Sequence, residues 1–403
     1  MTSLQNNFPP KTFWDVDYFV ENGFYQWMQP IQQELGNGQV IVEKYGEMIL
    51  LNSYSYLSLI GHPKINEAAK NAIEKYGTGT NGVRILAGTT PLHLELEQRI
   101  ADFKYTDEAI TFSSGYVANL STISSLMHVG DTVICDKINH ASIFDGCALS
   151  GAKMVRYNHN DMNHLEHRLK ESSNSKVRLV VVDAVFSMDG DVVDLPNVIY
   201  LCQKYGAYLM VDEAHSVGVL GKTGHGIEEH FGISADLIDI KMGTLSKTIP
   251  SIGGYVAGSS KFISFLKHEC RSFIFSASLP PPNVAAAKTA FDVIEDEPER
   301  VARLHENTDY FASKLRNAGF DLLQSTTAVF PLICGTKETA FKMQKYCFEK
   351  GVFVHAISAP AVPESLSRLR VTVTANHQLS DLDYCVDVLK RGAESFGIKL
   401  SSQ

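Results

Sequence analysis

Short apolar runs alternate with segments of helical periodicity through the middle of the chain. Seven runs lie between residues 109 and 258, and they are AITF, TVIC, KMVRY, RLVVVDAVF, AYLMVDEA, LIDIKM and GGYVAG. Continuous apolar runs are typical of parallel strands, because helices cover both faces of a parallel sheet. The alternation therefore predicts an α/β domain with a mostly parallel central sheet.

The pattern changes on both sides of this region. Residues 13–34 are rich in aromatic side chains and have a helical period, and the β-like stretch QVIVEKYGEMILLN follows them. A triple proline at 280–282 precedes a further helical segment, after which AVFPLICG, GVFVHAI and RLRVTVTA predict strands of a smaller α+β domain. We therefore divide the chain into an N-terminal helix with short strands that pack on the other domains (1–55), a large α/β domain (56–285) and a small C-terminal α+β domain (286–403).

The composition narrows the range of partners. The chain has 403 residues, of which 44% are hydrophobic and 20% are charged, and a formal net charge of −9. Its field would repel nucleic acid and anionic membranes. No run approaches the roughly 18–20 apolar residues of a transmembrane helix, and no secretory signal is visible. The seven scattered cysteines predict reduced thiols. We therefore expect a cytoplasmic protein with no nucleic-acid partner, no integral membrane segment and no bound metal.

Polar side chains follow the apolar runs at the points where the predicted strands end. Ligands of open α/β sheets bind at the carboxyl ends of the strands, so these side chains should meet at one rim. They are Ser114, Gly115, Tyr116, His140, Ser187, Asp212, His215, Thr244, Ser246 and Lys247. Their convergence is a stronger indication of a site than any single residue.

Lys247 stands among small and hydroxyl residues in the stretch GTLSKTIPSIGGYVAG. Most lysines lie at the surface with the amine in water, and this one could do the same. The small neighbours argue against that interpretation, because they let the backbone approach a ligand closely. A lysine amine becomes a nucleophile toward carbonyl groups when burial or a nearby cation lowers its pKa.

Three ionisable side chains at the rim each have an ordinary interpretation and a functional one. Asp212 ends a strongly apolar run, where a carboxylate needs a partner. It could cap a helix or form a structural ion pair, or it could keep a heteroaromatic nitrogen protonated. His215 could reach the same ligand, and His140 could stack on a planar ring, although either histidine alone is more often a core or capping residue.

A phosphate site is the third feature of the rim. Ser114, Gly115 and Tyr116 open a segment that could be helical, and a helix N-terminus offers free N–H groups and partial positive charge to a phosphate. Thr244 and Ser246 could add hydroxyl donors, whereas the alternative is an ordinary helix cap. A phosphate cradle, a stacking imidazole, a carboxylate and a reactive lysine together describe pyridoxal 5′-phosphate chemistry.

Several long motifs occur in one order along the chain. They are GFYQWMQPI, GTGTNGVRILAGTT, NHASIFDG, FSMDGDVVDLP, VDEAHSVGVLG, GTLSKTIPSIGGYVAG, FIFSASLPPP and RLRVTVTANH. With these motifs, the sequence from about residue 22 to 395 resembles the α-oxoamine synthases, a branch of the fold-type-I pyridoxal-phosphate-dependent transferases. Within that branch it resembles the soluble bacterial serine palmitoyltransferases most closely.

The resemblance implies roles for the rim residues. Lys247 would form the Schiff base with pyridoxal 5′-phosphate, Asp212 would partner its ring nitrogen, and His140 would stack on its ring. His215 would bond to the phenolic oxygen with Ser187 nearby. The phosphate would be held by Ser114, Gly115, Tyr116, Thr244 and Ser246. Ser276, in FSAS, matches a position that reaches the phosphate of a neighbouring subunit, which implies an obligate homodimer with active sites at the interface.

The resemblance also implies contacts with two substrates. Arg370 would bind the amino-acid carboxylate, although without the resemblance it would pass for a strand residue paired with a surface acid. Ser55 stands in YSYLSL, where the family commonly has asparagine. At the glycine-rich loop, relatives that use succinyl thioesters resemble GGTRN, whereas this chain has NGVRI with Val83, Arg84 and Ile85. The two aliphatic side chains favour an apolar acyl tail.

We therefore expect a decarboxylative condensation of an amino acid with an acyl thioester on coenzyme A or an acyl carrier protein. L-serine and a long-chain acyl group would give a 3-keto long-chain base of the kind used in sphingolipid biosynthesis, with CO₂ and free thiol. The alternatives are another α-oxoamine synthase that uses glycine, alanine or cysteate, of the 2-amino-3-ketobutyrate ligase or 8-amino-7-oxononanoate synthase type. The motifs favour a plain aminotransferase or a non-catalytic subunit less than an α-oxoamine synthase. A nicotinamide-dependent oxidoreductase fails on context, because GTGTNG follows a helix rather than a strand.

Overall fold

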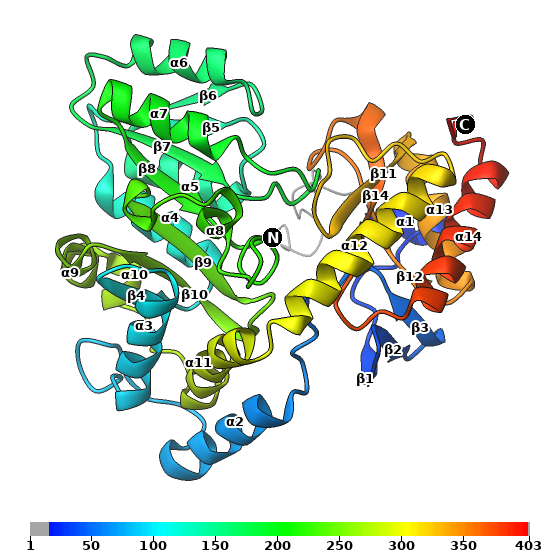
Figure 1. Ribbon diagram of the computed structural model, residues 1–403, viewed down its shortest axis with the longest axis horizontal. Coiled ribbons are helices and arrows are strands. Elements are labelled where there is room, and N and C mark those ends of the chain that lie inside the picture. The colour runs from blue at the N-terminus through cyan, green and yellow to red at the C-terminus, as the bar shows by residue number, and fades with distance from the viewer. Residues whose placement is uncertain (1–15, 402–403) are drawn as a thin grey trace, which may run out of the picture. The chain divides into compact units, whose positions relative to one another are not determined.

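The computed structural model describes residues 16–401, and its internal contacts divide them into two compact units (Figure 1). The larger unit holds residues 54–306 and 326–328, and the smaller unit holds the remainder. The division falls within α12 (Glu299–Asn317), later than the boundary that the sequence predicted before residue 286. The reason is that α11 (Pro281–Asp296) packs against α2 (Pro63–Tyr76) and α3 (Pro91–Phe103) of the larger unit.

A seven-stranded sheet forms the centre of the larger unit, in the order β4-β10-β9-β8-β7-β5-β6. Its strands are β4 (Glu108–Phe112), β5 (Thr132–Asp136), β6 (Lys153–Tyr157), β7 (Arg178–Asp183), β8 (Tyr208–Asp212), β9 (Ile240–Ser246) and β10 (Pro250–Gly258). β10 runs antiparallel to both of its neighbours, and the other pairs are parallel. The α/β fold with a mostly parallel sheet is confirmed, and each predicted apolar run contributes a strand.

Helices cover both faces of this sheet, which is why its strands are apolar on both sides. On β7, Leu179 and Val181 pack into one core, and the alternating Val180 and Val182 pack into the other. The first core is closed by α4 (Gly115–Leu126), α5 (Ala141–Ser150), α9 (Ser260–Glu269) and α10 (Arg271–Ile274). The second is closed by α6 (Met162–Glu171), α7 (Leu195–Tyr205) and α8 (Ile227–Phe231). The short 3₁₀ helix η2 (Ala235–Leu237) precedes β9, so the run LIDIKM becomes a strand only from Ile240.

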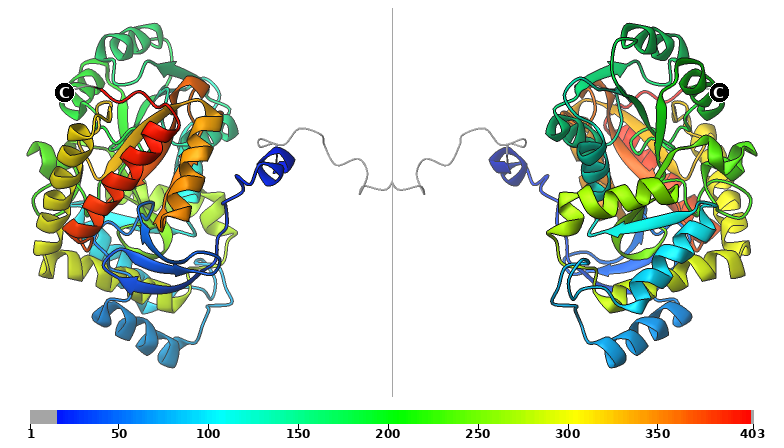
Figure 2. Two further views of the ribbon diagram at one scale, coloured as in Figure 1. Left: turned by 90° about the vertical axis from the view of Figure 1, so that its right-hand side faces the viewer. Right: turned by 90° about the vertical axis from the view of Figure 1, so that its left-hand side faces the viewer.

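The smaller unit contains two small sheets, and it joins most of the predicted C-terminal α+β segment to the N-terminal strands that the sequence analysis placed in a separate segment. One sheet has the order β1-β2-β3-β12, with β1 (Ile31–Gly36), β2 (Gln39–Val42), β3 (Gly46–Leu50) and β12 (Val352–Phe353). The other has the order β11-β14-β13, with β11 (Val329–Gly335), β13 (His355–Ile357) and β14 (Ser367–Thr372). The 3₁₀ helix η3 (Glu364–Leu366) directly precedes β14 in the sequence. Helices α13 (Lys337–Glu349) and α14 (Leu379–Ser395) lie side by side, as the left view of Figure 2 shows in orange and red.

The helical period predicted for residues 13–34 is wrong for most of that segment. Residues 13–15 lie outside the described part of the chain, and only Val16–Glu21 form a helix, α1. Gly23 has a φ of +67°, which ends the helix, and the segment continues as the exposed strand β1. The aromatic side chains pack on one another instead, with Phe19 against Phe341 of α13 at a centroid distance of 4.6 Å.

Four buried charged side chains form a network behind the carboxyl end of β8. The Lys104 ammonium lies 2.7 Å from Glu213 and 2.9 Å from Glu228, and the Lys241 ammonium lies 2.9 Å from Glu228. All four side chains are at most 8% exposed. The two cations and two anions cancel, which is the condition for keeping such groups in a core.

We expect Lys241→Met to lower the free energy of unfolding by about 3–5 kcal/mol, because it leaves Glu228 with excess buried charge. Adding Glu228→Met should recover part of that loss, since the remaining Lys104–Glu213 pair is neutral. The urea midpoints of the two variants, with the exposed Lys261→Met as control, measure the effect. Losses that simply add would contradict the neutral-network interpretation.

Candidate functional site

A cavity of about 230 Å³ lies at the carboxyl ends of β8 and β9 in the larger unit. Nine of the residues predicted from strand ends line it, and they are Ser114, Gly115, Tyr116, His140, Asp212, His215, Thr244, Ser246 and Lys247. The parallel strands bring these residues together from segments more than a hundred positions apart, as the strand-end rule requires.

Asp212 ends β8 and is 5% exposed. Its carboxylate accepts hydrogen bonds from the Asn119 side chain, at 2.6 Å, and from the Ala214 backbone N–H, at 2.9 Å. Asn119 also donates to Ser142, at 3.0 Å, and the Ser142 hydroxyl lies 2.7 Å from Nδ1 of His140. One chain of hydrogen bonds therefore fixes both the carboxylate and the imidazole.

The His140 imidazole is suited to remain neutral. Burial lowers its pKa, and the positive charge of Lys247 acts in the same direction, whereas Asp212 opposes the shift. Its ring packs edge-on against Tyr116 at a centroid distance of 6.2 Å. A neutral imidazole can pack on a flat heteroaromatic ring without the desolvation penalty of a charge.

Lys247 follows the last residue of β9 and reaches into the cavity. Its Nζ lies 2.9 Å from Nε2 of His215, and Nδ1 of His215 lies 2.8 Å from the hydroxyl of Tyr56. The ring of Tyr54 lies beside both groups, 5.5 Å from Nζ and 5.6 Å from the imidazole. The amine is therefore surrounded by protein groups rather than extended over the surface.

The first turn of α4 forms the opposite wall. Ser114 is the N-cap, and its hydroxyl accepts the Val117 N–H at 3.1 Å, so it serves as an ordinary cap. The N–H groups of Gly115 and Tyr116 belong to the first turn, where no intrahelical acceptor exists. The hydroxyls of Thr244 and Ser246, 2.9 Å apart, face the same wall. This arrangement can hold a phosphate or another small anion.

Several predicted residues of the larger unit lie outside this cavity's lining, and they include Ser187, Ser276, Val83, Arg84 and Ile85. Ser187 follows β7, and Ser276 lies in a separate small cavity with Arg84. The Arg84 guanidinium forms a bidentate ion pair with Glu97, at 2.6 and 2.9 Å, with both side chains at most 7% exposed. Val83 pairs with Ala277, next to Ser276, and Ile85 is 54% exposed. Their roles toward an acyl chain or a neighbouring subunit stay predictions.

The two predicted amino-acid contacts lie in different units. Ser55 is buried in the larger unit, between Tyr54 and Tyr56. Arg370 lies in the smaller unit on β14, where its backbone pairs with Pro331 and His355, and it is 4% exposed. Burial lowers the pKa of His355 to about 4, so this neighbour does not add positive charge at neutral pH. The carboxylate-binding role of Arg370 stays a prediction.

Three kinds of residue that line or support the cavity were not predicted from the sequence. Asp183 ends β7 beside Asp212 in the register, and burial together with the Asp212 charge raises its pKa well above the usual range. It ends an apolar run as Asp212 does, so the same signal was present. Asn119 lies one helical turn after Gly115, in the segment that Ser114, Gly115 and Tyr116 open. Tyr54 and Tyr56 lie far upstream, and local sequence gives no sign of their contact with His215.

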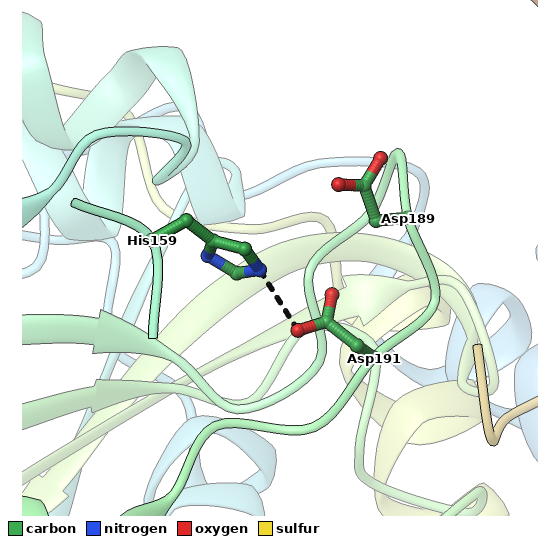
Figure 3. A group of neighbouring side chains, drawn as sticks. All are labelled: His159, Asp189 and Asp191. Carbon is green, nitrogen blue, oxygen red and sulfur yellow. Dashed lines mark hydrogen bonds and ion pairs between the residues drawn. The ribbon is translucent and has the colours of Figure 1, made fainter. Parts of the chain in front are cut away.

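Figure 3 shows a second cluster of polar side chains, His159, Asp189 and Asp191, whose ligand atoms could surround a metal ion. Nε2 of His159 lies 2.9 Å from Asp191, and Nδ1 lies 3.1 Å from Asp136. Burial disfavours the charged ring, but the two carboxylates raise the pKa of His159 to about 10. His159 therefore forms an ionic clasp with Asp136 at the end of β5 and Asp191 in the loop after β7.

The clasp makes stability depend on pH. The folded-state pKa of His159 lies above its ordinary value of 6.5, so its contribution is complete below about pH 6.5 and is lost as the pH rises to about 10. We expect His159→Gln to lower the melting temperature at about pH 6 and to change it little at about pH 10. The exposed His167→Gln is the control. Melting curves displaced equally at every pH would contradict the shifted titration.

Comparisons with known proteins agree with this geometry. Residues 46–389 match the family model of class I and II aminotransferases. The 8-amino-7-oxononanoate synthase of Geobacter sulfurreducens is 44% identical over 95% of this chain and 98% of its own, and that of Bacillus velezensis is 42% identical over 94% and 96%. The serine palmitoyltransferase of S. paucimobilis, solved with a PLP–myriocin aldimine, has a TM-score of 0.91 at 33% identity, covering 95% of this chain and 96% of that one.

Two further findings bear on the expectations from sequence. The curated relatives favour the 8-amino-7-oxononanoate synthase alternative over the expected serine palmitoyltransferase, and they give sphingolipid biosynthesis no support. Among the described residues, no helix is both long enough and apolar enough to cross a bilayer.

Proposed function

Because the chain belongs to the class I and II aminotransferase family and, within it, to the pyridoxal-phosphate-dependent α-oxoamine synthases, we propose that it makes 8-amino-7-oxononanoate. The product's name defines the substrates. An α-oxoamine synthase joins an acyl group to the α-carbon of an amino acid and releases the carboxylate as CO₂. A methyl group beside the amine then requires alanine, and the remaining seven carbons require a heptanedioyl (pimeloyl) thioester.

The cavity fits the cofactor that this family uses. A Cβ added to Gly115 would lie 3.1 Å from the Thr244 side chain, so glycine keeps space beside the first-turn N–H groups for a phosphate. Asn119 Oδ1 is buried and has no hydrogen-bond partner among the described residues, so this wall of the cavity retains one free acceptor. The donor set of helix N-terminus, carboxylate, imidazole and amine also matches a phosphorylated pyridine aldehyde.

Each of these residues has a defined task. Pyridoxal 5′-phosphate, when bound, supplies an electron sink for the negative charge that develops at Cα. Asp212 would stabilise the protonated ring nitrogen of the bound cofactor. The hydrogen bonds from Asn119 and Ala214 hold the Asp212 carboxylate in place. Lys247 removes the Cα proton at Nζ and can return it after CO₂ has left. His140 holds the flat ring from one side, which orients the reacting bond.

The overall reaction balances with the uptake of one proton from water, which the released thiolate takes. A carbon–carbon bond forms between Cα and the thioester carbonyl carbon, and the carbon–sulfur bond breaks to release the thiol. The bond from Cα to the carboxylate breaks, and a proton takes its place. Arg370, from the smaller unit, is proposed to bind that carboxylate before it leaves.

A second candidate is the condensation of serine with a long-chain acyl thioester. It is favoured by the TM-score of 0.91 with serine palmitoyltransferase and by the aliphatic Val83 and Ile85. Burying a methylene is worth roughly 0.8 kcal/mol, so the five methylenes of a pimeloyl chain gain about 4 kcal/mol and a longer chain gains more. The distal carboxylate of a pimeloyl group needs a partner or water, and Arg84 is already paired with Glu97.

We also propose that the enzyme is a homodimer. Ser276 lies outside the cavity of its own chain, next to Phe275, which is 72% exposed. An exposed aromatic residue beside a serine expected to contact a second phosphate fits an interface between two copies of the chain.

The substrate proposal is tested by a matrix of alanine, serine and glycine against pimeloyl, palmitoyl, acetyl and succinyl thioesters, on coenzyme A and on acyl carrier protein. CO₂ release and the mass of the aminoketone are measured. We expect the highest kcat/KM with alanine and the pimeloyl thioester. A maximum with serine and the palmitoyl thioester would replace this substrate pair by the second candidate and would leave the family assignment intact.

A second test concerns Asp212. We expect Asp212→Asn to keep the cofactor but to slow exchange of the Cα hydrogen of alanine in deuterated water by about 10²–10⁴-fold, because an amide cannot hold the ring nitrogen protonated. The visible spectrum measures cofactor content and NMR measures the exchange. Asp236→Asn, outside this cavity's lining, is the control. Exchange at the parent rate in Asp212→Asn would refute the role.

A further inference from the structure

Tyr56, His215 and Lys247 form a line of hydrogen-bonding groups that leads from the core into the cavity. The Tyr56 hydroxyl lies 2.8 Å from Nδ1 of His215, and Nε2 of the same ring lies 2.9 Å from Nζ of Lys247. Tyr56 is fully buried and His215 is 6% exposed, so the contact between them is shielded from water. Neither the strand-end rule nor the motif comparison gave Tyr56 a role.

The direction of these hydrogen bonds decides whether Nε2 of His215 is a donor or an acceptor toward the cavity. A neutral imidazole carries one N–H, and the other nitrogen accepts. If Tyr56 donates to Nδ1, then Nε2 carries the proton and donates into the cavity. If Nδ1 carries the proton, then Nε2 presents a lone pair there instead.

Two arguments select the first arrangement. A phenol is a better hydrogen-bond donor than acceptor, and a buried tyrosine hydroxyl normally donates its proton. In addition, an Nε2–H that points at the lone pair of Nζ disfavours protonation of Lys247, and a lysine that attacks a carbonyl has to be a neutral amine.

We propose that Tyr56 is a positioning residue that fixes His215 as the Nε2–H tautomer. From Nε2, His215 would donate a hydrogen bond toward Lys247 and, once Lys247 holds the cofactor, toward the phenolic oxygen of that cofactor. This inference rests on the proposed function, because it assumes that Lys247 is the reactive amine. It adds a residue 159 positions upstream of the histidine that it orients.

The first test is direct and needs no variant. Nitrogen-15 NMR of histidine-labelled holoenzyme, with His215→Gln to assign the signal, should show an unprotonated Nδ1 and a protonated Nε2 at His215 at neutral pH. The opposite tautomer, or a ring protonated at both nitrogens, would overturn the proposal even if the tyrosine variant does not fold.

The second test is Tyr56→Phe, which removes only the hydroxyl. Without the Tyr56 hydroxyl, the His215 ring should no longer be restricted to the Nε2–H tautomer, and its hydrogen bond from Nε2 should weaken. The pH midpoint of the visible-band titration of the holoenzyme should then rise by about one unit. KM for alanine should change little, whereas kcat should fall. Tyr255→Phe is the matched control, because Tyr255 is equally buried and its hydroxyl has no partner among the described residues. A midpoint that stays with the parent and the control would overturn the proposal.

The same samples distinguish a failure of the tautomer proposal from a failure of the proposed function. Borohydride reduction and peptide mapping of the parent protein should find the cofactor on Lys247. An adduct on another lysine would refute the proposed function, and the tautomer proposal with it. An adduct on Lys247 combined with an unshifted Tyr56→Phe titration would refute the tautomer proposal alone.

Discussion

The buried carboxylate at the end of β8 imposes the main constraint on this site. Asp212 is 5% exposed, and an ionised carboxylate in such a place is stable only with donors around it. The side chain of Asn119 and the N–H of Ala214 provide them. Asn119 can do so only if the first turns of α4 lie across the end of the sheet, and this placement also brings the N-terminus of α4 to the cavity. Satisfying one carboxylate therefore also forms the anion-binding wall.

Two neighbouring strands, β5 and β7, also end in a buried carboxylate. Asp136, Asp183 and Asp212 end β5, β7 and β8, and all three are at most 5% exposed. Each is satisfied differently. The His159 imidazolium neutralises Asp136, burial and the nearby Asp212 raise the pKa of Asp183, and hydrogen bonds hold Asp212. The two neighbouring carboxylates are thus either neutralised by a cation or shifted toward the neutral form, and Asp212 is the hydrogen-bonded carboxylate that lies between the sheet and the Lys247 side of the cavity.

The sequence was sufficient where local pattern decides structure. Continuous apolar runs identified the strands, and the residues just after them identified most of the cavity, because parallel strands carry their carboxyl ends to one edge. It was insufficient where contacts between distant segments decide. Gly23 and the packing of Phe19 on Phe341 override the helical period of residues 13–34. Tyr56 meets His215 only in the folded chain. The packing of α11 on α2 and α3 likewise moved the division of the chain beyond the proline-marked boundary.

The choice of substrate is another property that local sequence does not decide. The cavity has a volume of about 230 Å³, and the groups proposed to hold the cofactor would be the same for either substrate, so they cannot distinguish a pimeloyl from a palmitoyl chain. Discrimination has to arise where the acyl chain leaves the cavity. There an alkyl end gains about 0.8 kcal/mol for each buried methylene, and a carboxylate end requires a donor or water. The proposed contacts of the aliphatic Val83 and Ile85 with the acyl chain favour an alkyl end, whereas the identity of 44% to an 8-amino-7-oxononanoate synthase favours a carboxylate end. The two can be reconciled if the five methylenes lie along the aliphatic loop and the distal carboxylate ends in water, since an exposed carboxylate needs no protein partner.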